Sequence, residues 1–345
     1  MSGGSTLKDL ADQLGLSTAT VSRALSGHPR ISEETRERVA AAARDAAYVP
    51  NRAAQSLASG RATGFVGLVT CDPGYGREAS YLGEFVQGLG QGLHERGVDL
   101  FLSFQADPEA EMAAIRNIVR TRRADGLILG RTAEADPRID WLLTQGFPFV
   151  TFGRTAAEPA PFDWVDTDGA AAFAQAGQML YALGHRHFGL ITIEEGMTFR
   201  RHRSEGLARA LAGTDARLSV ATSPRYDATL RRRAIHQMLT APDRPTAIVA
   251  LFDGLALAVV EEAQVLGLRI PQDLSVIGFD NIHAAEHCRP ALTTFDSETM
   301  AAARELATLL IARMADPKAP PNHHLIVPRL VLRNSHGPAP QPERS

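Results

Sequence analysis

The chain has 345 residues, enough for two or three domains, and its composition (44% hydrophobic, 22% charged, 29 Gly and 20 Pro) excludes collagen, coiled coils and wholesale disorder. A formal net charge of −3 indicates neither a nucleic acid nor a membrane surface as partner of the whole chain. Residues 1–63 nevertheless carry a net charge of +2 and the remainder −5, so we expect a small basic head ahead of an acidic body.

The head is predicted to contain three short helices. The first covers residues 6–14 with Thr6 as its N-cap, and it ends before a glycine suited to a left-handed cap. Ser17 is expected to cap the second helix and Ser32 the third, which runs to about Ala47. Leucine, valine and alanine recur at helical spacing in all three, which indicates one shared apolar core.

Two short helices joined by a tight turn and braced by a third are typical of a helix-turn-helix, whose second helix reads bases in the major groove. The outward side chains of the second helix are short except for one arginine, so its backbone can approach DNA while one guanidinium reaches a guanine. These positions are Ser17, Thr18, Ala19, Ser22 and Arg23. The helical spacing alone is also compatible with a small three-helix bundle that does not bind DNA, and this is the alternative.

Several independent landmarks lie in residues 6–69. They are VSRAL in the second helix, ISEETRERV in the third, the junction Tyr48-Val49-Pro50-Asn51 and the segment RAAQSLA at 52–58. With them, this stretch resembles the lac repressor (LacI/GalR) family of transcriptional regulators. The resemblance implies that the protein binds operator DNA, and it adds further contact residues: Thr6, Arg30, Asn51, Gln55 and Leu57.

A hinge helix is expected after the third helix. Pro50 favours a helix start, residues 52–58 are mostly good helix formers, and Gly60 ends the run. A two-turn helix is too short to be stable alone, so it needs a partner. By resemblance, the segment becomes helical when two copies meet on DNA, and Leu57 is inserted into the minor groove. The alternative is a leucine packed on the body.

From Phe65 onward, apolar runs alternate with amphipathic helices, which predicts parallel sheets with crossover helices. The expected strands are 65–70, 98–103, 126–130 and 147–152, then 187–193, 218–222, 247–251 and 274–278. The expected helices are 80–95, 109–121 and 137–145, then 168–183, 203–212, 227–240 and 254–267. Two such halves form a cleft whose ligand sites lie at the carboxyl ends of the strands.

The expected fold class is therefore a small all-α helix-turn-helix head plus an α/β body of two doubly wound parallel-sheet subdomains. The body also resembles the LacI/GalR family, through residues 184–187, 203–207, 275–281 and 290–294. This resemblance implies a periplasmic-binding-protein-like fold that holds a small effector between its subdomains. The expected boundaries are 1–49 for the helix-turn-helix domain, 50–63 for the hinge helix and linker, 64–337 for the effector-binding and dimerisation domain, and 338–345 for a disordered tail.

Arg203 and Asp280 are the leading candidates for effector binding, and both match effector-binding positions of the family. An arginine fork can hold hydroxyls or a carboxylate, and an aspartate at a strand end can accept hydrogen bonds from two sugar hydroxyls. Helix capping or an interdomain salt bridge is the alternative for both. The remaining candidates are Tyr226 and Phe252, for stacking on a sugar ring, and Tyr81 and Arg154, for closure from the first half.

Three further features of the sequence bear on the nature of the effector. Many sugar-binding relatives have asparagine where this chain has Phe252, so their sugar specificity does not transfer directly. Asp253 is expected to cap the following helix rather than to contact a ligand. Residues 128–131 and 149–154 resemble the α-glucoside-utilisation branch of the family. The expected effector is a small sugar, with a purine-type corepressor as the alternative.

The motif search disfavours an enzyme. The sequence contains no GxxxxGK[ST], GxSxG or HExxH, and GLGQG at 88–92 is not GxGxxG. His323 and His324 lack the spacing of a metal-binding pair, and Cys71 and Cys288 have no metal-ligand spacing with other residues. We therefore expect neither a cofactor nor a metal.

A cytoplasmic solute-binding protein is the other alternative, but the predicted DNA-binding head opposes it. No signal-peptide pattern and no 18-residue apolar window is visible, which predicts a cytoplasmic protein without a membrane partner. A homodimer on a pseudo-palindromic operator is expected, because one recognition helix covers only a half-site. The Pro-rich ending HGPAPQPERS is too short for a tetramer-forming leucine-heptad helix.

Overall fold

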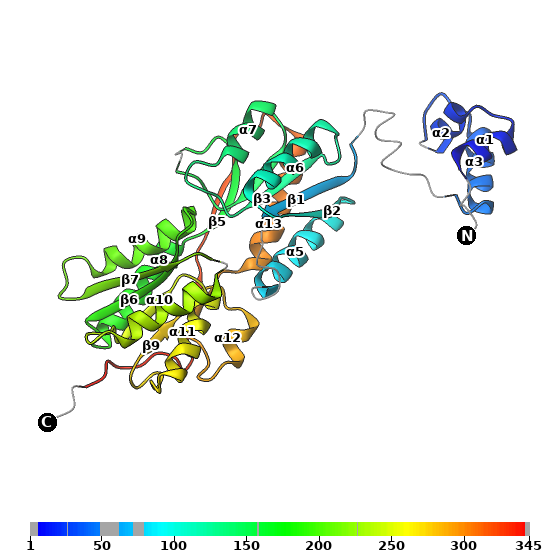
Figure 1. The fold of residues 1–345 in the computed structure, drawn as a ribbon. Helices are drawn as coiled ribbons and strands as arrows, with labels where there is room; N and C mark the ends of the chain where they lie inside the picture. Colours follow the sequence, from blue (N-terminus) through cyan, green and yellow to red (C-terminus); the bar gives the residue numbers. More distant parts are fainter. Residues whose placement is uncertain are drawn as a thin grey trace. The chain divides into compact units, whose positions relative to one another are not determined.

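The computed structural model describes residues 6–25, 27–48, 62–71, 79–156, 159–225 and 227–341. The chain divides into two compact units: Met1–Gly64 with Thr121–Asp125, and Phe65–Arg120 with Gly126–Ser345. Figure 1 labels the helices and strands of both units.

The described part of the head contains α1 (Leu7–Leu14), α2 (Thr18–Leu25) and α3 (Glu33–Asp45). Thr6 begins α1 with a capping box, in which its hydroxyl accepts a hydrogen bond from the Asp9 amide at 3.2 Å and the Asp9 carboxylate accepts one from the Thr6 amide at 2.8 Å. Gly15, at φ +63°, ends the helix.

Serine hydroxyls begin the other two head helices, as the sequence predicts. The Thr20 amide donates to Ser17 Oγ at 3.1 Å, and the Thr35 amide donates to Ser32 Oγ at 3.3 Å. The third helix ends slightly before its expected limit because Ala47 adopts φ +48°, a conformation that no α-helix accommodates.

An apolar core joins the three head helices. Leu10, Val21 and Val39 contribute one fully buried side chain from each helix. Burying each of them is favourable by about 1.5–3 kcal/mol, which outweighs what these short helices gain from local propensity. The buried stripe therefore determines which face of α2 is left for solvent.

The first subdomain of the larger unit is built on a parallel sheet whose described strands have the order β11-β5-β4-β3-β1-β2. These strands are β1 (Phe65–Cys71), β2 (Asp99–Gln105), β3 (Gly126–Gly130), β4 (Phe149–Phe152), β5 (Asp163–Thr167) and β11 (His323–Ile326). Its helices are α5 (Ala79–His94), α6 (Pro108–Arg120), α7 (Pro137–Gln145) and α13 (Thr299–Ala315).

The second subdomain has a parallel sheet with the described order β7-β6-β8-β9. Its strands are β6 (His187–Ile193), β7 (Arg217–Ser223), β8 (Ala247–Ala250) and β9 (Ser275–Ile277). Its helices are α8 (Gly169–Ala182), α9 (Thr198–Leu211), α10 (Ala228–Thr240), α11 (Asp253–Val265) and α12 (His283–His287). A short antiparallel pair, β10 (Thr294–Asp296) and β12 (Arg329–Val331), lies at its border.

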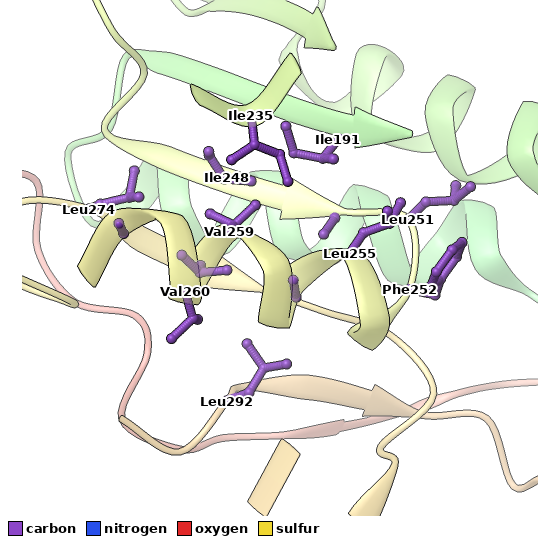
Figure 2. Packing of buried hydrophobic residues seen from close by; sticks show 14 of the residues in the cluster. Ile191, Ile235, Ile248, Leu251, Phe252, Leu255, Val259, Val260, Leu274 and Leu292 are labelled. Carbon is purple, nitrogen blue, oxygen red and sulfur yellow. The ribbon is translucent and has the colours of Figure 1, made fainter. Parts of the chain in front are cut away.

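The core of the second subdomain lies between α11 and the sheet, as Figure 2 shows. Ile248 of β8 faces Leu255 and Val259 of α11, and all three side chains are fully buried. Phe252 lies at the edge of this cluster and is 5% exposed. The core thus anchors the start of α11, where the residues around the cleft are found.

In its described part, the chain crosses between the subdomains after β5, after β10 and after β11. The second crossing brings α13 beside α5 in the first subdomain (Figure 1), where Ala303 and Leu306 pack in one cluster with Leu89. The third crossing follows β11, which pairs with β5 although about 160 residues separate them in the sequence.

The expected fold class is confirmed, and most expected elements lie within a few residues of their limits. Helix α9 begins at Thr198 instead of residue 203, and α13 was not predicted at all. Both lack a side-chain N-cap: α13 follows Glu298, which has φ +51°. Helix α13 buries one face at helical spacing, but alanines such as Ala301 and Ala312 on its exposed face blur the apolar stripe in the sequence.

Candidate functional site

The outer face of α2 presents the residues that the sequence singled out for base reading. Thr18, Ala19 and Arg23 are exposed and Ser22 is partly buried, while the inner face carries the core. The exposed N-terminus of α2, beside the Ser17 cap, offers backbone amides and the positive end of the helix dipole to a phosphate.

The other expected DNA contacts fall into two groups. Thr6 and Arg30 are exposed in the described head, and the Arg30 amide donates to His28 Nδ1 at 3.2 Å. Asn51, Gln55 and Leu57 lie outside the described residues, so their roles stay predictions.

A cavity of about 160 Å³ lies between the two subdomains of the larger unit. Most of its polar wall comes from the carboxyl ends of parallel strands, where open α/β sheets bind ligands. Arg131 and Thr132 follow β3, Asp166 lies near the end of β5, and Asp280 follows β9. The sequence-predicted residues that line the cavity are Tyr81, Arg203, Phe252 and Asp280.

Arg203 lies on α9 and is 7% exposed, with its guanidinium 3.7 Å from the ring centre of Phe279. Its Nη1 donates to the Leu251 carbonyl at 2.6 Å, and its Nη2 lies 3.9 Å from Asp280 Oδ1. Its Nε is buried and has no hydrogen-bond partner among the described residues. Burial lowers the pKa of Arg203, and the Asp280 carboxylate opposes that shift. The guanidinium thus sets a positive charge at the cavity wall near the Asp280 carboxylate, and this pair favours a ligand that offers both acceptor oxygens and hydroxyl donors.

A second carboxylate enters the cavity from the first subdomain. Asp166 Oδ2 accepts a hydrogen bond from Arg154 Nε at 3.0 Å. Burial raises the pKa of Asp166, and the Arg154 charge acts in the opposite direction. Arg154 is not among the residues that line the cavity, so in this structure it holds Asp166 from behind.

Aromatic rings form the apolar part of the wall. On one side, Phe152 lies with its ring centre 6.3 Å from that of Tyr81 and 5.2 Å from that of Phe85. On the other side, the guanidinium of Arg225 lies 5.0 Å from the ring centre of Phe252. Burial, followed by the Asp280 charge, raises the pKa of Tyr81, which keeps its phenol a neutral hydrogen-bond donor. Tyr226 lies outside the described residues.

The sequence matches two known families: "Bacterial regulatory proteins, lacI family" over residues 6–51, and "Periplasmic binding protein-like domain" over residues 178–336. It is 36% identical over 339 residues to the transcriptional regulator AglR of Rhizobium meliloti (strain 1021), which covers 97% of this chain and 95% of that relative. The chain belongs to the lacI family.

Further relatives agree with this membership. The transcriptional regulator CelR of Thermobifida fusca is 30% identical, over 96% of this chain and 98% of its own. A solved complex of the transcriptional regulator CelR with cellobiose matches with a TM-score of 0.72 at 29% identity, over 96% of this chain and 99% of that chain. The lac repressor dimer bound to operator matches with a TM-score of 0.81 at 23% identity, over 96% and 99%, and it shares the fold. The protein is a DNA-binding transcriptional regulator.

In this lacI-family regulator, the expected role of Asp253 as an N-cap is wrong. Phe252 occupies the N-cap of α11, and Asp253 is already inside the helix, fully buried. Its Oδ2 accepts a hydrogen bond from the Ile282 amide at 2.9 Å, and its Oδ1 accepts one from the Thr294 hydroxyl at 2.6 Å. Burial, followed by the nearby Asp280 charge, raises the pKa of Asp253 to about 8. Asp253 therefore holds the loop behind Asp280 instead of the helix end.

Several cavity residues of this family member were not predicted: Arg131, Thr132, Asp166, Phe199 and Arg225. Arg131 and Thr132 directly follow an expected strand, so the strand-end rule could have found them. Asp166 lies on β5, whose sequence Asp-Trp-Val-Asp-Thr contains no apolar run, so the sequence pattern does not predict this strand. Among the described residues, no three histidine, cysteine or acidic side chains are grouped to hold a metal, and no helix is long and apolar enough to span a membrane.

Proposed function

We propose that this regulator is a homodimer whose affinity for a pseudo-palindromic operator is controlled by a small sugar bound in the cavity. The observation that most supports this proposal is the pairing of Arg203 and Asp280 in a cavity that also has aromatic walls. Sugars need both features, because their C–H faces pack on rings while their hydroxyls require fixed donors and acceptors.

Opposite sides of the cavity would share the ligand. Asp280 would accept hydrogen bonds from sugar hydroxyls, and the Arg203 guanidinium, whose Nη2 lies 3.9 Å from Asp280 Oδ1, would donate to the oxygens of the same ligand. Asp166, held by Arg154, would bind from the first subdomain. The solved CelR–cellobiose complex and the α-glucoside resemblance of residues 128–131 and 149–154 both support a glucose-containing disaccharide as the first ligand class to test.

Control of DNA binding would follow from closure of the cavity. The two subdomains can exchange between an open and a closed arrangement, and a ligand that contacts both favours the closed one. The ligand shifts this equilibrium only by the difference between its affinities for the two arrangements. Such coupling is typically about 1–3 kcal/mol, or roughly 5–150-fold in affinity, and operator DNA must change ligand affinity by the same factor. The head is joined to β1 of the first subdomain through residues 50–63, the expected hinge and linker, so a movement of that subdomain would act on the head through this segment.

The proposal assigns no catalytic activity, which is consistent with relatives that are transcriptional regulators. A purine-type corepressor is the alternative ligand class; the chain is also 28–29% identical to the transcriptional repressors PurR and CytR, so the family members similar to it are not confined to one regulator. The charged pair and the strand-end carboxylate favour a ligand rich in hydroxyls over a planar base.

A ligand screen tests the effector proposal. Thermal shift against maltose, cellobiose, glucose, adenine and hypoxanthine identifies ligands, and fluorescence anisotropy on a selected operator then measures the response to each. Asp280→Asn should abolish the response while ligand-free operator affinity stays near wild type; asparagine is chosen because it keeps the size of the aspartate and removes only its charge and one acceptor oxygen. Asp140→Ala, at an exposed site on α7, is the control. A full response in Asp280→Asn at the original sugar concentration would show that the sugar does not bind through Asp280.

A paired substitution tests the reading helix. Arg23→Ala should cost about 1–3 kcal/mol on the best operator and relax specificity at one base pair. Arg23→Lys retains the charge but loses the bidentate fork, so it should relax specificity while leaving the salt dependence nearly unchanged. If operator selection returns the same base preference for all three proteins, Arg23 does not read a base.

A further inference from the structure

The loop that carries Asp280 has an unusual backbone. Asp280 has φ +111° and Asn281 has φ +53°, although neither is glycine. Asparagine tolerates the left-handed region of Asn281, but φ +111° lies outside that region, costs an aspartate of order 1–3 kcal/mol and persists only where the surroundings hold it. Asp280 lines the cavity, whereas Asn281 is not among the lining residues.

The side chain of Asn281 joins two segments that lie far apart in the sequence. Its Nδ2 donates to Asp296 Oδ2 at 3.0 Å, and its Oδ1 accepts from Arg333 Nη2 at 2.8 Å. Asp296 is the last residue of β10, and Arg333 follows the end of β12. An amide suits this place, because it offers a donor to the carboxylate and an acceptor to the guanidinium.

Both segments lead directly to crossings between the subdomains. After Asp296, the chain passes through Glu298, at φ +51°, into α13 of the first subdomain. Asp296 Oδ1 accepts from the Glu298 amide at 2.9 Å. Arg329, which begins β12 after the crossing from β11, donates to Asp296 Oδ2 at 3.1 Å and lies 3.7 Å from Glu298 Oε1.

These contacts place Asn281 between the cavity and the crossings. The Asp280 amide also donates to the carbonyl of Phe295 in β10, at 2.8 Å. Rotation of one subdomain against the other must change torsions in the crossing segments. Any such change would alter the position of Asp296, and through it the strained loop on which Asp280 stands.

We propose that Asn281 is a positioning residue that couples Asp280 to the two crossings, so that a ligand on Asp280 biases the relative rotation of the subdomains. The inference rests on the proposed role of the cavity as the sugar site. It adds the path by which a sugar in the cavity changes the relative rotation of the subdomains. Asn281 touches neither ligand nor DNA in this scheme. Replacing Asn281 should therefore reduce the effect of the sugar on operator binding more than it reduces the affinity for the sugar or for the operator.

Exchanging the side chains of Asn281 and Asp296 tests the proposal. Asn281→Asp retains the acceptor for Arg333 but sets a second carboxylate against Asp296. The double variant Asn281→Asp with Asp296→Asn restores one amide donor and one carboxylate with their positions reversed. The amide oxygen at position 296 can still accept from the Glu298 amide, and only the contact from the exposed Arg329 is lost. Asn334→Asp is the matched control, since Asn334 is exposed and its side chain makes no hydrogen bond with a described residue.

Hydrogen exchange without any ligand gives the first readout. In Asn281→Asp, exchange of the Ile282 and Glu298 amides should rise roughly tenfold, and the double variant should recover most of that protection. The control should match wild type. Faster exchange at Ile282 with no change at Glu298 would overturn the proposed connection, whether or not the cavity binds a sugar.

The second readout is the factor by which maltose, or separately cellobiose, changes operator affinity. Asn281→Asp should bring this factor close to one while the sugar still binds, within roughly tenfold of wild type, and the double variant should restore the factor. An unchanged factor in Asn281→Asp overturns the inference. Failure of both sugars and the rest of the screen to affect wild type rejects the proposed effector instead, and leaves the exchange experiment to decide the connection.

Discussion

Replacing Gly206 of α9 with alanine should destabilise the larger unit, although alanine is the better helix former. A Cβ atom at Gly206 would lie 2.2 Å from the carbonyl oxygen of Ala170 and 2.7 Å from its Cα, both in the backbone of α8. Because the clash is with backbone atoms, no side-chain rotation can relieve it. Alanine therefore has to push α9 away from α8.

Two opposing effects determine the magnitude. Alanine in place of a helical glycine is worth about 0.8–1 kcal/mol through propensity. Overpacking typically costs about 1–3 kcal/mol, and a backbone contact this close belongs at the upper end of that range. The net expectation is a loss of about 1–2 kcal/mol in the free energy of unfolding. Because α9 carries Arg203, the same displacement should also weaken sugar binding.

Urea denaturation of Gly206→Ala and Gly83→Ala checks this reasoning. Gly83 lies within α5, and a Cβ there would meet nothing within 4 Å, so only the propensity effect remains. Gly83→Ala should therefore stabilise the protein by about 0.5–1 kcal/mol. The two substitutions should have opposite signs. Stabilisation by Gly206→Ala of the same size as in Gly83→Ala would refute the close contact between α8 and α9.

Two further predictions concern titration and capping. In the folded protein the pKa of Asp253 is about 8, whereas an ordinary aspartate has a pKa of 3.8. Between about pH 4 and 8 the folded state therefore keeps a proton that the unfolded state has lost. The free energy of unfolding should fall as the pH rises through this range, by at most ~1.4 kcal/mol per pH unit. Asp253→Asn should flatten that part of the stability profile, and an unchanged slope would contradict the raised pKa. Thr6→Ala removes the α1 capping box and should cost the head about 1 kcal/mol in thermal unfolding, whereas Thr6→Ser should restore most of it.

The sequence alone was sufficient to predict elements whose signals are local. Thr6, Ser17 and Ser32 begin the head helices because each cap bonds to an amide two or three residues ahead, which depends on nothing distant. Apolar runs alternating with helical patterns predicted the α/β body for the same reason. Arg203 and Asp280 were found through family resemblance and strand ends, and the structure brings them together on the second subdomain.

Only the tertiary structure decided the features that join distant parts of the chain. Strand β5, which brings Asp166 to the cavity, lies between β4 and the distant strand β11, and Asp280 reaches the same cavity from the other subdomain. Asp253 has the residue type and position of a helix cap, but its carboxylate is turned inward by partners some 30 and 40 residues away, Ile282 and Thr294. A cap signal describes only neighbouring residues. The direction in which a buried carboxylate points depends on which distant donors the fold brings within hydrogen-bond distance, because burial without them would be too costly.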